Sequence, residues 1–177
     1  MNTEHVIYIF TDAATSPQAE IAVGAFICLD KKSIDLLFVN QDLESQLTAK
    51  ISYQQFKSKK STWSEIQTLL HALKSIHDIP AQTKIEIYTD CQTLCDLLGK
   101  RKAKLQSNNY LTRSGKPFPH AKLYQELHAI INDYQINIYK IKGHAAQSKR
   151  LTWQEQVFAI IDKLSRRKLR LLVKNVD

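Results

Sequence analysis

Apolar residues recur along several parts of the chain with the spacing of an amphipathic helix. In the clearest case, between Thr62 and Ile76, the apolar positions are Ile66, Leu69, Leu70, Leu73 and Ile76. Steps of three and four residues place these side chains on one face of a helix. Comparable patterns predict further helices over residues 91–98, 121–131 and from about 152 to beyond 170.

Short apolar runs rich in β-branched and aromatic residues predict the strands. These runs cover residues 6–10, 21–29, 84–89 and 136–141. The third strand along the chain has two candidates, residues 34–39 and residues 49–56, and turns are expected at 13–18 and 30–33. Gly24, inside the second strand, is typical of a bulge or of a close approach by another segment.

The order of these elements predicts the class of fold. Antiparallel strands come first and β-α-β crossovers follow, which implies an α/β fold with a mixed sheet flanked by helices. A length of 177 residues is typical of one domain, so we expect residues 1–177 to form a single domain. Hydrophobic residues make up 44% of the chain, which is enough for a sizeable core.

Several classes of protein are disfavoured by the sequence. No apolar run approaches the roughly 18 residues that a membrane span needs, and residues 1–11 do not resemble a secretory signal. The three cysteines, Cys28, Cys91 and Cys95, contain no C-x-x-C pair, which argues against a disulfide framework or a zinc ribbon. We therefore expect a reduced, cytoplasmic protein that acts as a monomer and does not bind membranes.

The charge balance points to a polyanionic partner. Twenty-five Lys and Arg residues against seventeen Asp and Glu residues give a net charge of +8. An excess of this kind favours binding to nucleic acid through long-range attraction and counterion release. Residues 97–125 contain no acidic side chain, but they contain Lys100, Arg101, Lys102, Lys104, Arg113, Lys116 and Lys122. A second basic cluster spans 163–174. Either cluster could instead be an ordinary solvated surface.

Four carboxylates lie where the predicted elements would concentrate chemistry. Asp12 and Asp90 follow predicted strands, whereas Glu65 and Asp162 lie on predicted helices. Each has a structural alternative: a polar strand exit for Asp12, a helix cap for Asp90, the capping box Thr62-x-x-Glu65, and a solvated helix face for Asp162. If the four carboxylates converge, their repulsion requires cations, and oxygen ligands suit Mg²⁺ or Mn²⁺.

Six short blocks of the sequence, taken in order, resemble the ribonuclease H family. They are Tyr8-Ile9-Phe10-Thr11-Asp12, Ala22-Val23-Gly24-Ala25-Phe26, Ser64-Glu65, Ile87-Tyr88-Thr89-Asp90-Cys91-Gln92, Lys140-Ile141-Lys142-Gly143-His144 and Ile161-Asp162-Lys163-Leu164-Ser165-Arg166. They span nearly the whole chain. The resemblance implies a ribonuclease H-like fold, a five-stranded mixed sheet with helices on both faces. We expect no N-terminal hybrid-binding module of the kind that some members carry.

The same resemblance implies an activity and a metal centre. Asp12, Glu65, Asp90 and Asp162 would hold two Mg²⁺ (or Mn²⁺) ions about 3.5–4 Å apart. The enzyme would then be an endonuclease that hydrolyses the RNA strand of RNA–DNA hybrids and leaves a 5′-phosphate and a 3′-hydroxyl. His144 matches the family's histidine after the last strand, which assists proton movement or product release; its alternative is a surface-loop histidine.

The resemblance also implies residues that contact the substrate. Gln92 matches a position that contacts the minor groove of the hybrid. Lys100, Arg101, Lys102 and Lys104 lie where many members carry a basic substrate-binding protrusion.

Two departures from the family pattern affect substrate choice rather than the metal centre. Ala13-Ala14 stands where many members have Gly-Ser, and Ser61 with Thr62 stands where many have Asn before the helical glutamate. Positions of this kind usually read the 2′-hydroxyls that distinguish RNA from DNA. The alternatives are therefore a nuclease of this fold acting on double-stranded RNA or branched DNA, and a non-catalytic nucleic-acid-binding domain.

Overall fold

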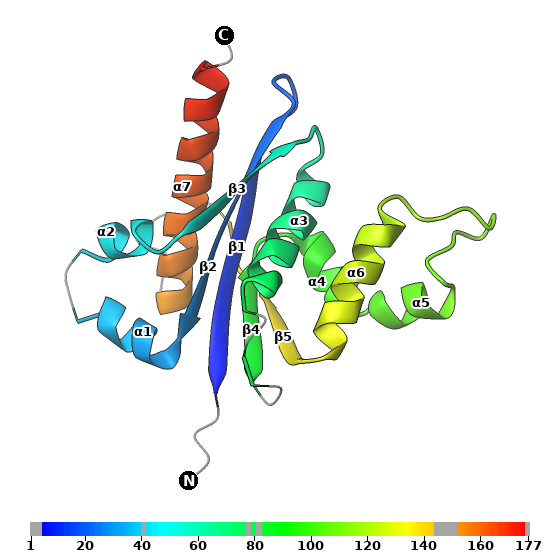
Figure 1. Ribbon diagram of the computed structural model, residues 1–177, viewed down its shortest axis with the longest axis horizontal. Coiled ribbons are helices and arrows are strands. Elements are labelled where there is room, and N and C mark those ends of the chain that lie inside the picture. Colours follow the sequence, from blue (N-terminus) through cyan, green and yellow to red (C-terminus); the bar gives the residue numbers. More distant parts are fainter. Residues whose placement is uncertain (1–4, 40–41, 77–78, 81–82, 144–151, 176–177) are drawn as a thin grey trace.

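The computed structural model describes residues 5–39, 42–76, 79–80, 83–143 and 152–175. Within them, five strands form one mixed sheet, which confirms the expected five-stranded mixed sheet, and the strand order is β3-β2-β1-β4-β5. The strands are β1 (Val6–Ser16), β2 (Ile21–Asp30), β3 (Ser52–Lys57), β4 (Lys84–Thr89) and β5 (Gln135–Lys140). β1 pairs antiparallel with β2 and parallel with β4, so it lies at the centre of the sheet (Figure 1).

Helices cover both faces of the sheet (Figure 1). One face carries α3 (Ser61–Lys74), α4 (Gln92–Leu98), α5 (Lys102–Ser107) and α6 (Ala121–Asn132). The other face carries α7 (Trp153–Lys174) with the short helices α1 (Lys31–Leu37) and α2 (Leu43–Thr48). Among the described residues, no helix combines the length and the apolar character needed to cross a membrane.

The alternation of side chains along β1 explains why its first half is an unbroken apolar run. Ile9 and Phe10 are both fully buried but point to opposite faces, because successive side chains of a strand alternate. Ile9 packs in the core beneath α3, whereas Phe10 stacks on Tyr88 at a ring-centroid distance of 4.9 Å and meets the edge of Trp153. The central strand therefore contributes to two cores at once.

In the N-terminal half, the predicted turn at residues 13–18 is wrong, and the structure decides between the two candidates for the third strand. β1 continues through residues 13–16 and leaves only residues 17–20 for the turn, because every residue from 11 to 16 pairs with β2. Residues 34–39 are not the third strand, which is β3. Instead, Asp30 caps α1 by accepting a hydrogen bond from the backbone of Ser33 at 2.7 Å. The three-residue spacing of Ile34 and Leu37 then buries one helix face.

The basic stretch between α4 and α6 contains secondary structure of its own. α5 occupies part of it, with Leu105 buried, and an isolated bridge joins Leu111 to Pro117. The imidazole Nε2 of His128 donates to the carbonyl of Leu97 at 2.9 Å, so its Nδ1 accepts from the Tyr110 hydroxyl at 2.8 Å. Burial lowers the pKa of His128, which favours this neutral form. These contacts fasten the basic segment to α6.

Gly24 lets α3 approach β2 closely, which is one of the two roles that the sequence predicts for it. A Cβ atom at this position would overlap the side chain of Thr68, which is itself fully buried. The Thr68 hydroxyl donates to the carbonyl of Ser64 at 2.7 Å and has little freedom to move away. Because α3 also carries Glu65, this close packing sets the height of that carboxylate above the sheet.

We predict that Gly24→Ala destabilises the protein by about 1–3 kcal/mol, because the added methyl overpacks the contact between β2 and α3. Urea unfolding measures the change. Thr68→Ala removes part of the obstruction, so the double variant should lose less stability than the two single losses added together. Additive losses would show that the glycine is not required by this contact.

Candidate active site

The first and fourth strands separate where two of the predicted carboxylates lie. β1 and β4 pair in parallel up to Phe10 and Tyr88; beyond this point β1 remains paired with β2, whereas the chain after β4 turns into α4. Asp12 and Asp90 both lie just past this last pair. In α/β sheets, a crevice forms at the carboxyl ends of strands where the connections diverge in opposite directions. The topology therefore brings the two side chains to one opening.

Glu65 of α3 completes a group of three carboxylates. Asp12, Glu65 and Asp90 each offer an oxygen atom, and these atoms lie within 4.8 Å of one another. Oε1 of Glu65 accepts a hydrogen bond from the backbone N–H of Ala13 at 3.2 Å. Oε2 is buried without a hydrogen-bond partner among the described residues. An unpartnered buried oxygen facing two other carboxylates suits a cation ligand.

The capping roles that the sequence allows for Glu65 and Asp90 are not found. α3 is preceded by Lys60 at its N-cap, and α4 by Cys91, and neither has a side-chain capping hydrogen bond. A capping box does occur in the chain, but at the start of α7, between Thr152 and Glu155.

Asp162, on α7, lines the same pocket from the opposite wall. Its side chain is buried rather than solvated, and Nη2 of Arg166 donates to its Oδ2 at 2.5 Å. Asp162 is not part of the group within 4.8 Å, which comprises the other three carboxylates. The four predicted carboxylates therefore share one pocket, three of them in close contact and the fourth paired with an arginine.

The pocket is bounded by small residues on β1 and by basic residues on α7. Its volume is about 360 Å³. The lining residues are Asp12, Ala13, Ala14, Thr15, Glu65, Asp90, Asp162, Arg166, Leu169 and Arg170. Acidic and basic side chains therefore line the same pocket side by side.

Crowding and burial make the negative charge of this pocket unfavourable. Burial raises the pKa of Asp12 to about 6, and the charges of Asp162 and Asp90 act in the same direction. Burial, Asp12 and Asp90 together raise the pKa of Glu65 well above its usual value. A hard divalent cation such as Mg²⁺ or Mn²⁺ would relieve this repulsion, and the all-oxygen donor set suits it.

Two residues that sequence reasoning missed shape the position of the carboxylates. Ser165 is fully buried on α7, and its hydroxyl donates a hydrogen bond to Oδ2 of Asp12. Gly143 lies so close to Asp90 that a Cβ atom would meet the carboxylate oxygen. Ser165 follows Asp162 by three residues and so shares its side of the helix, which is the one signal that the sequence offers.

Two of the residues predicted to contact substrate are exposed at the starts of helices. Ser61 is exposed as the first residue of α3, and Gln92 is exposed as the first residue of α4. Gln92 donates to Asp96 at 2.9 Å and accepts from Lys140 at 2.8 Å.

The basic residues predicted to bind substrate surround the start of α5. Lys100 and Lys104 are exposed, whereas Arg101 and Lys102 are half-buried. Lys100 lies 3.3 Å from the carboxylate of Asp96. His144 falls in residues 144–151, outside the described residues.

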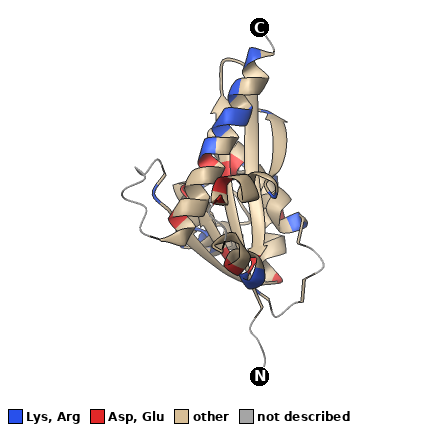
Figure 2. Cartoon of the chain, turned by 90° about the vertical axis from the view of Figure 1, so that its left-hand side faces the viewer, with Lys and Arg blue, Asp and Glu red and all other residues tan. Residues whose placement is uncertain are grey.

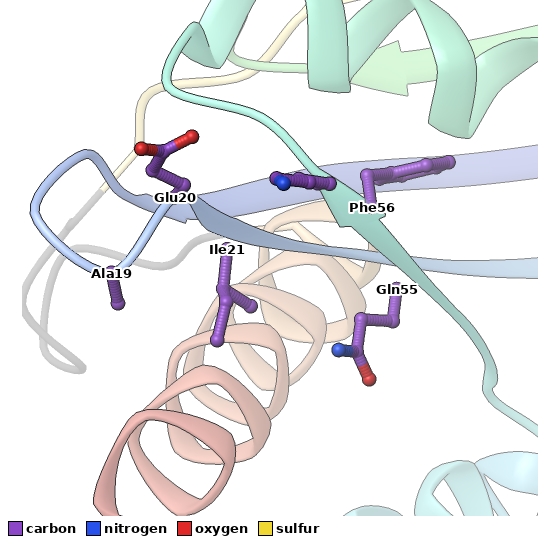
Figure 3. A pocket seen from close by; sticks show the side chains of 6 residues that line it. Ala19, Glu20, Ile21, Gln55 and Phe56 are labelled. Atoms are coloured by element: carbon purple, nitrogen blue, oxygen red, sulfur yellow. The ribbon is translucent and has the colours of Figure 1, made fainter. Parts of the chain in front are cut away.

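A second pocket lies at the turn between β1 and β2 and differs in character. It has a volume of about 420 Å³ and is lined by Ala19, Glu20, Ile21, Gln55, Phe56 and Lys57. Figure 3 shows Ile21 and Gln55 pointing to one side of the sheet, whereas Glu20 and Phe56 point to the other. Its one carboxylate, Glu20, pairs with Lys59 at 3.0 Å. This pocket therefore offers no cluster of cation ligands.

The sequence of this chain is similar to those of several known proteins. A family model for RNase H matches residues 4–166. The curated Ribonuclease H of Francisella tularensis subsp. novicida (strain U112) is 26% identical over 93 residues, covering 52% of this chain and 61% of that protein. A Ribonuclease H of Rhizobium johnstonii is 27% identical over 77 residues, covering 44% and 51%. The chain thus spans less than two thirds of the length of these relatives.

Solved structures share the fold. The solution structure of the PFV RNase H domain has a TM-score of 0.63 and 18% identity, and the match covers 93% of both chains. A foamy viral protease-reverse transcriptase in complex with an RNA/DNA hybrid has a TM-score of 0.59 and 13% identity, with 92% of this chain and 19% of that chain covered.

We predict that Asp12→Asn stabilises the metal-free protein in a pH-dependent way. A carboxyl whose pKa is raised on folding costs stability once the pH exceeds its unfolded value, and the full cost is reached above its folded value of about 6. The difference in the free energy of unfolding between the variant and wild type should therefore grow, in favour of the variant, by on the order of 3 kcal/mol from about pH 4 to pH 7. Thermal unfolding in EDTA at both pH values measures this gain. The exposed Asp133→Asn is the control, and an equal gain for both variants would contradict the assignment.

Ser165→Ala should weaken the binding of Mn²⁺ or Mg²⁺ about fivefold, because a hydrogen bond that holds Asp12 in place contributes about 1 kcal/mol. Titration calorimetry measures the affinity. Ser64→Ala is the matched control, since Ser64 is also a buried helical serine but its hydroxyl donates to the backbone carbonyl of Lys60 and not to a carboxylate. Equal affinities for Ser165→Ala and wild type would remove Ser165 from the site.

Proposed function

The chain belongs to the ribonuclease H family, and from this premise we propose that it is an endonuclease that hydrolyses the RNA strand of RNA–DNA hybrids with the help of Mg²⁺ or Mn²⁺. The observation that carries the proposal is the group formed by Asp12, Glu65 and Asp90. A protein that only bound phosphates would gain nothing from burying negative charge at the centre of a basic chain. The proposal includes a monomeric protein in the cytoplasm.

In this proposal, Asp12, Glu65 and Asp90 hold the cations, and Asp162 contributes from the opposite wall of the pocket. Bound divalent cations would supply a lowered pKa for the attacking water and charge stabilisation for the leaving 3′ oxygen, in the manner of two-metal sites. The protein's part is to hold the ligands in place before substrate arrives. Ser165 fixes one oxygen of Asp12, and the backbone of Ala13 fixes one oxygen of Glu65.

Substrate contacts follow from the surface around the pocket. Ser61 and Gln92 are proposed to meet the hybrid at the first residues of α3 and α4, where both are exposed. The basic residues at the start of α5 are proposed to contact phosphates: Lys100, Arg101, Lys102 and Lys104. His144 is proposed to assist proton movement or product release.

Glu65→Gln separates a catalytic role from a structural one. The amide keeps the hydrogen bond from Ala13 but loses the charge that a cation needs, so we expect turnover to fall at least about a hundredfold. The melting temperature should not fall, because the charge that is removed is itself unfavourable in this pocket. The measurement is cleavage of a labelled RNA–DNA hybrid, an RNA duplex and a DNA duplex, each with Mg²⁺, Mn²⁺ or EDTA.

The exposed Glu126→Gln serves as the control for loss of a carboxylate. Cleavage of the RNA duplex or of DNA in preference to the hybrid would favour the second enzymatic function. Binding without cleavage under every condition would favour a non-catalytic nucleic-acid-binding domain. Normal turnover by Glu65→Gln would remove Glu65 from the metal centre.

A further inference from the structure

The half of α7 beyond Asp162 carries a dense positive charge that the proposed metal chemistry does not use. Residues 163–175 contain six basic side chains and no acidic one. Figure 2 shows basic residues continuing along this half of the helix towards the C-terminus, with acidic residues gathered beside its middle. A helix that served only to cover the sheet would not need this charge beyond the pocket.

Most of these side chains share one helix face. At about 100° per residue, Arg166, Arg167, Arg170 and Lys174 fall within an arc of about 100°. The opposite arc contains the buried Val157, Ile161 and Leu164. All four basic residues are exposed, so they form a continuous strip facing away from the core, which we call the α7 basic face. Lys168 is also exposed but points about 160° away from Arg170.

The α7 basic face runs directly into the acidic pocket. Arg166 and Arg170 line the pocket that holds the four carboxylates. Arg166 pairs with Asp162, and Lys163, which precedes these residues on the same side of the helix, pairs with Glu44 at 2.7 Å. Among the described residues, Arg167, Arg170 and Lys174 take part in no ion pair. Their charges are available to a ligand that continues out of the pocket.

We propose that the α7 basic face is a binding surface for the sugar-phosphate backbone of a nucleic-acid duplex whose scissile phosphate lies in the acidic pocket. This proposal rests on the proposed nuclease function. Arginine forks match phosphate oxygens, and three of the four residues are arginines. The helix rises about 18 Å from Asp162 to Lys174, which equals the length of about five base pairs.

This surface lies on the other side of the sheet from α5 (Figure 1). The family resemblance places substrate contacts on the basic segment around α5, whereas α7 packs against the opposite face. A duplex held by both segments would be supported on both sides of the scissile phosphate. The α7 basic face would then extend the contact between the protein and the duplex away from the α5 side.

A nucleic acid fits these observations better than an anionic membrane does. The basic residues continue into a pocket lined by carboxylates, where a phosphodiester can share bound cations but a lipid surface cannot enter. A membrane-binding helix would also present a broad apolar face to the acyl chains. In this half of α7, Leu171 is the one large apolar side chain that is strongly exposed among the described residues.

The test compares a triple variant, Arg167→Gln with Arg170→Gln and Lys174→Gln, with wild type. Both proteins bind a fluorescent RNA–DNA hybrid of about 20 base pairs, longer than the proposed surface. Anisotropy is measured in EDTA at several salt concentrations, so that binding is separated from cleavage. We expect Kd to rise at least about tenfold, and the slope of log affinity against log salt to fall by about 2–3.

Single variants provide the matched control. Arg170→Gln should weaken binding, whereas Lys168→Gln removes one charge from the same helix and should leave Kd and the salt slope unchanged. Equal effects of the two would indicate general charge attraction and would overturn the assignment to one helix face. An unchanged Kd and slope in the triple variant would overturn it as well, even if the wild-type enzyme cleaves hybrids.

Failure of the nuclease function gives a different result. If wild type cleaves no substrate but the triple variant still loses affinity, the proposed function is wrong while the binding surface stands. Vesicles containing phosphatidylserine form the last arm of the test. If wild type binds these vesicles more tightly than the hybrid, and the triple variant loses this binding, the surface recognises membranes and the nucleic-acid assignment is wrong.

Discussion

Asp12, Glu65 and Asp90 hold carboxylate oxygens within 4.8 Å of one another in a largely buried pocket, and each charge raises the cost of the next. The packing of the fold must oppose this repulsion. It does so by placing the three residues on separate elements whose positions are fixed elsewhere. The central strand β1 supplies one carboxylate, α3 the second, and the end of β4 the third. Every other feature of the site follows from holding like charges together.

Close packing on both faces of β1 supplies this restraint. On one face, Gly24 admits Thr68, and α3 lies close enough for Glu65 to accept from the backbone beside Asp12. On the other face, Ser165 of α7 donates to Asp12. The repulsion is thus opposed by short-range contacts that are distributed over two hydrophobic cores. Three carboxylates held in this way are ready to bind a cation, because they need little rearrangement on binding.

Positive and negative charges are unevenly distributed around the pocket. The basic segment around α5 and the α7 basic face lie on opposite sides of the sheet, and the acidic pocket opens towards α7, whose Arg166 and Arg170 line it. A polyanion attracted by the overall charge of +8 would be repelled by the carboxylates unless cations filled the pocket. Cation binding and nucleic-acid binding should therefore support each other, since each neutralises charge that opposes the other.

The sequence by itself determined the α/β class, most of the helix and strand positions, and the four acidic residues of the pocket. Periodicity reports which side chains are buried, and this was sufficient for β4, α3 and α7. Periodicity was not sufficient for residues 34–39, where capping by Asp30 favours a helix. It was also not sufficient for the length of β1, which depends on pairing with β2. Only the tertiary structure decided that Glu65 faces Asp12 instead of capping its helix, and that Ser165 reaches β1 across 153 positions of the chain. Contacts between distant segments leave no periodic signal, because they depend on how the elements pack and not on the pattern within any one of them.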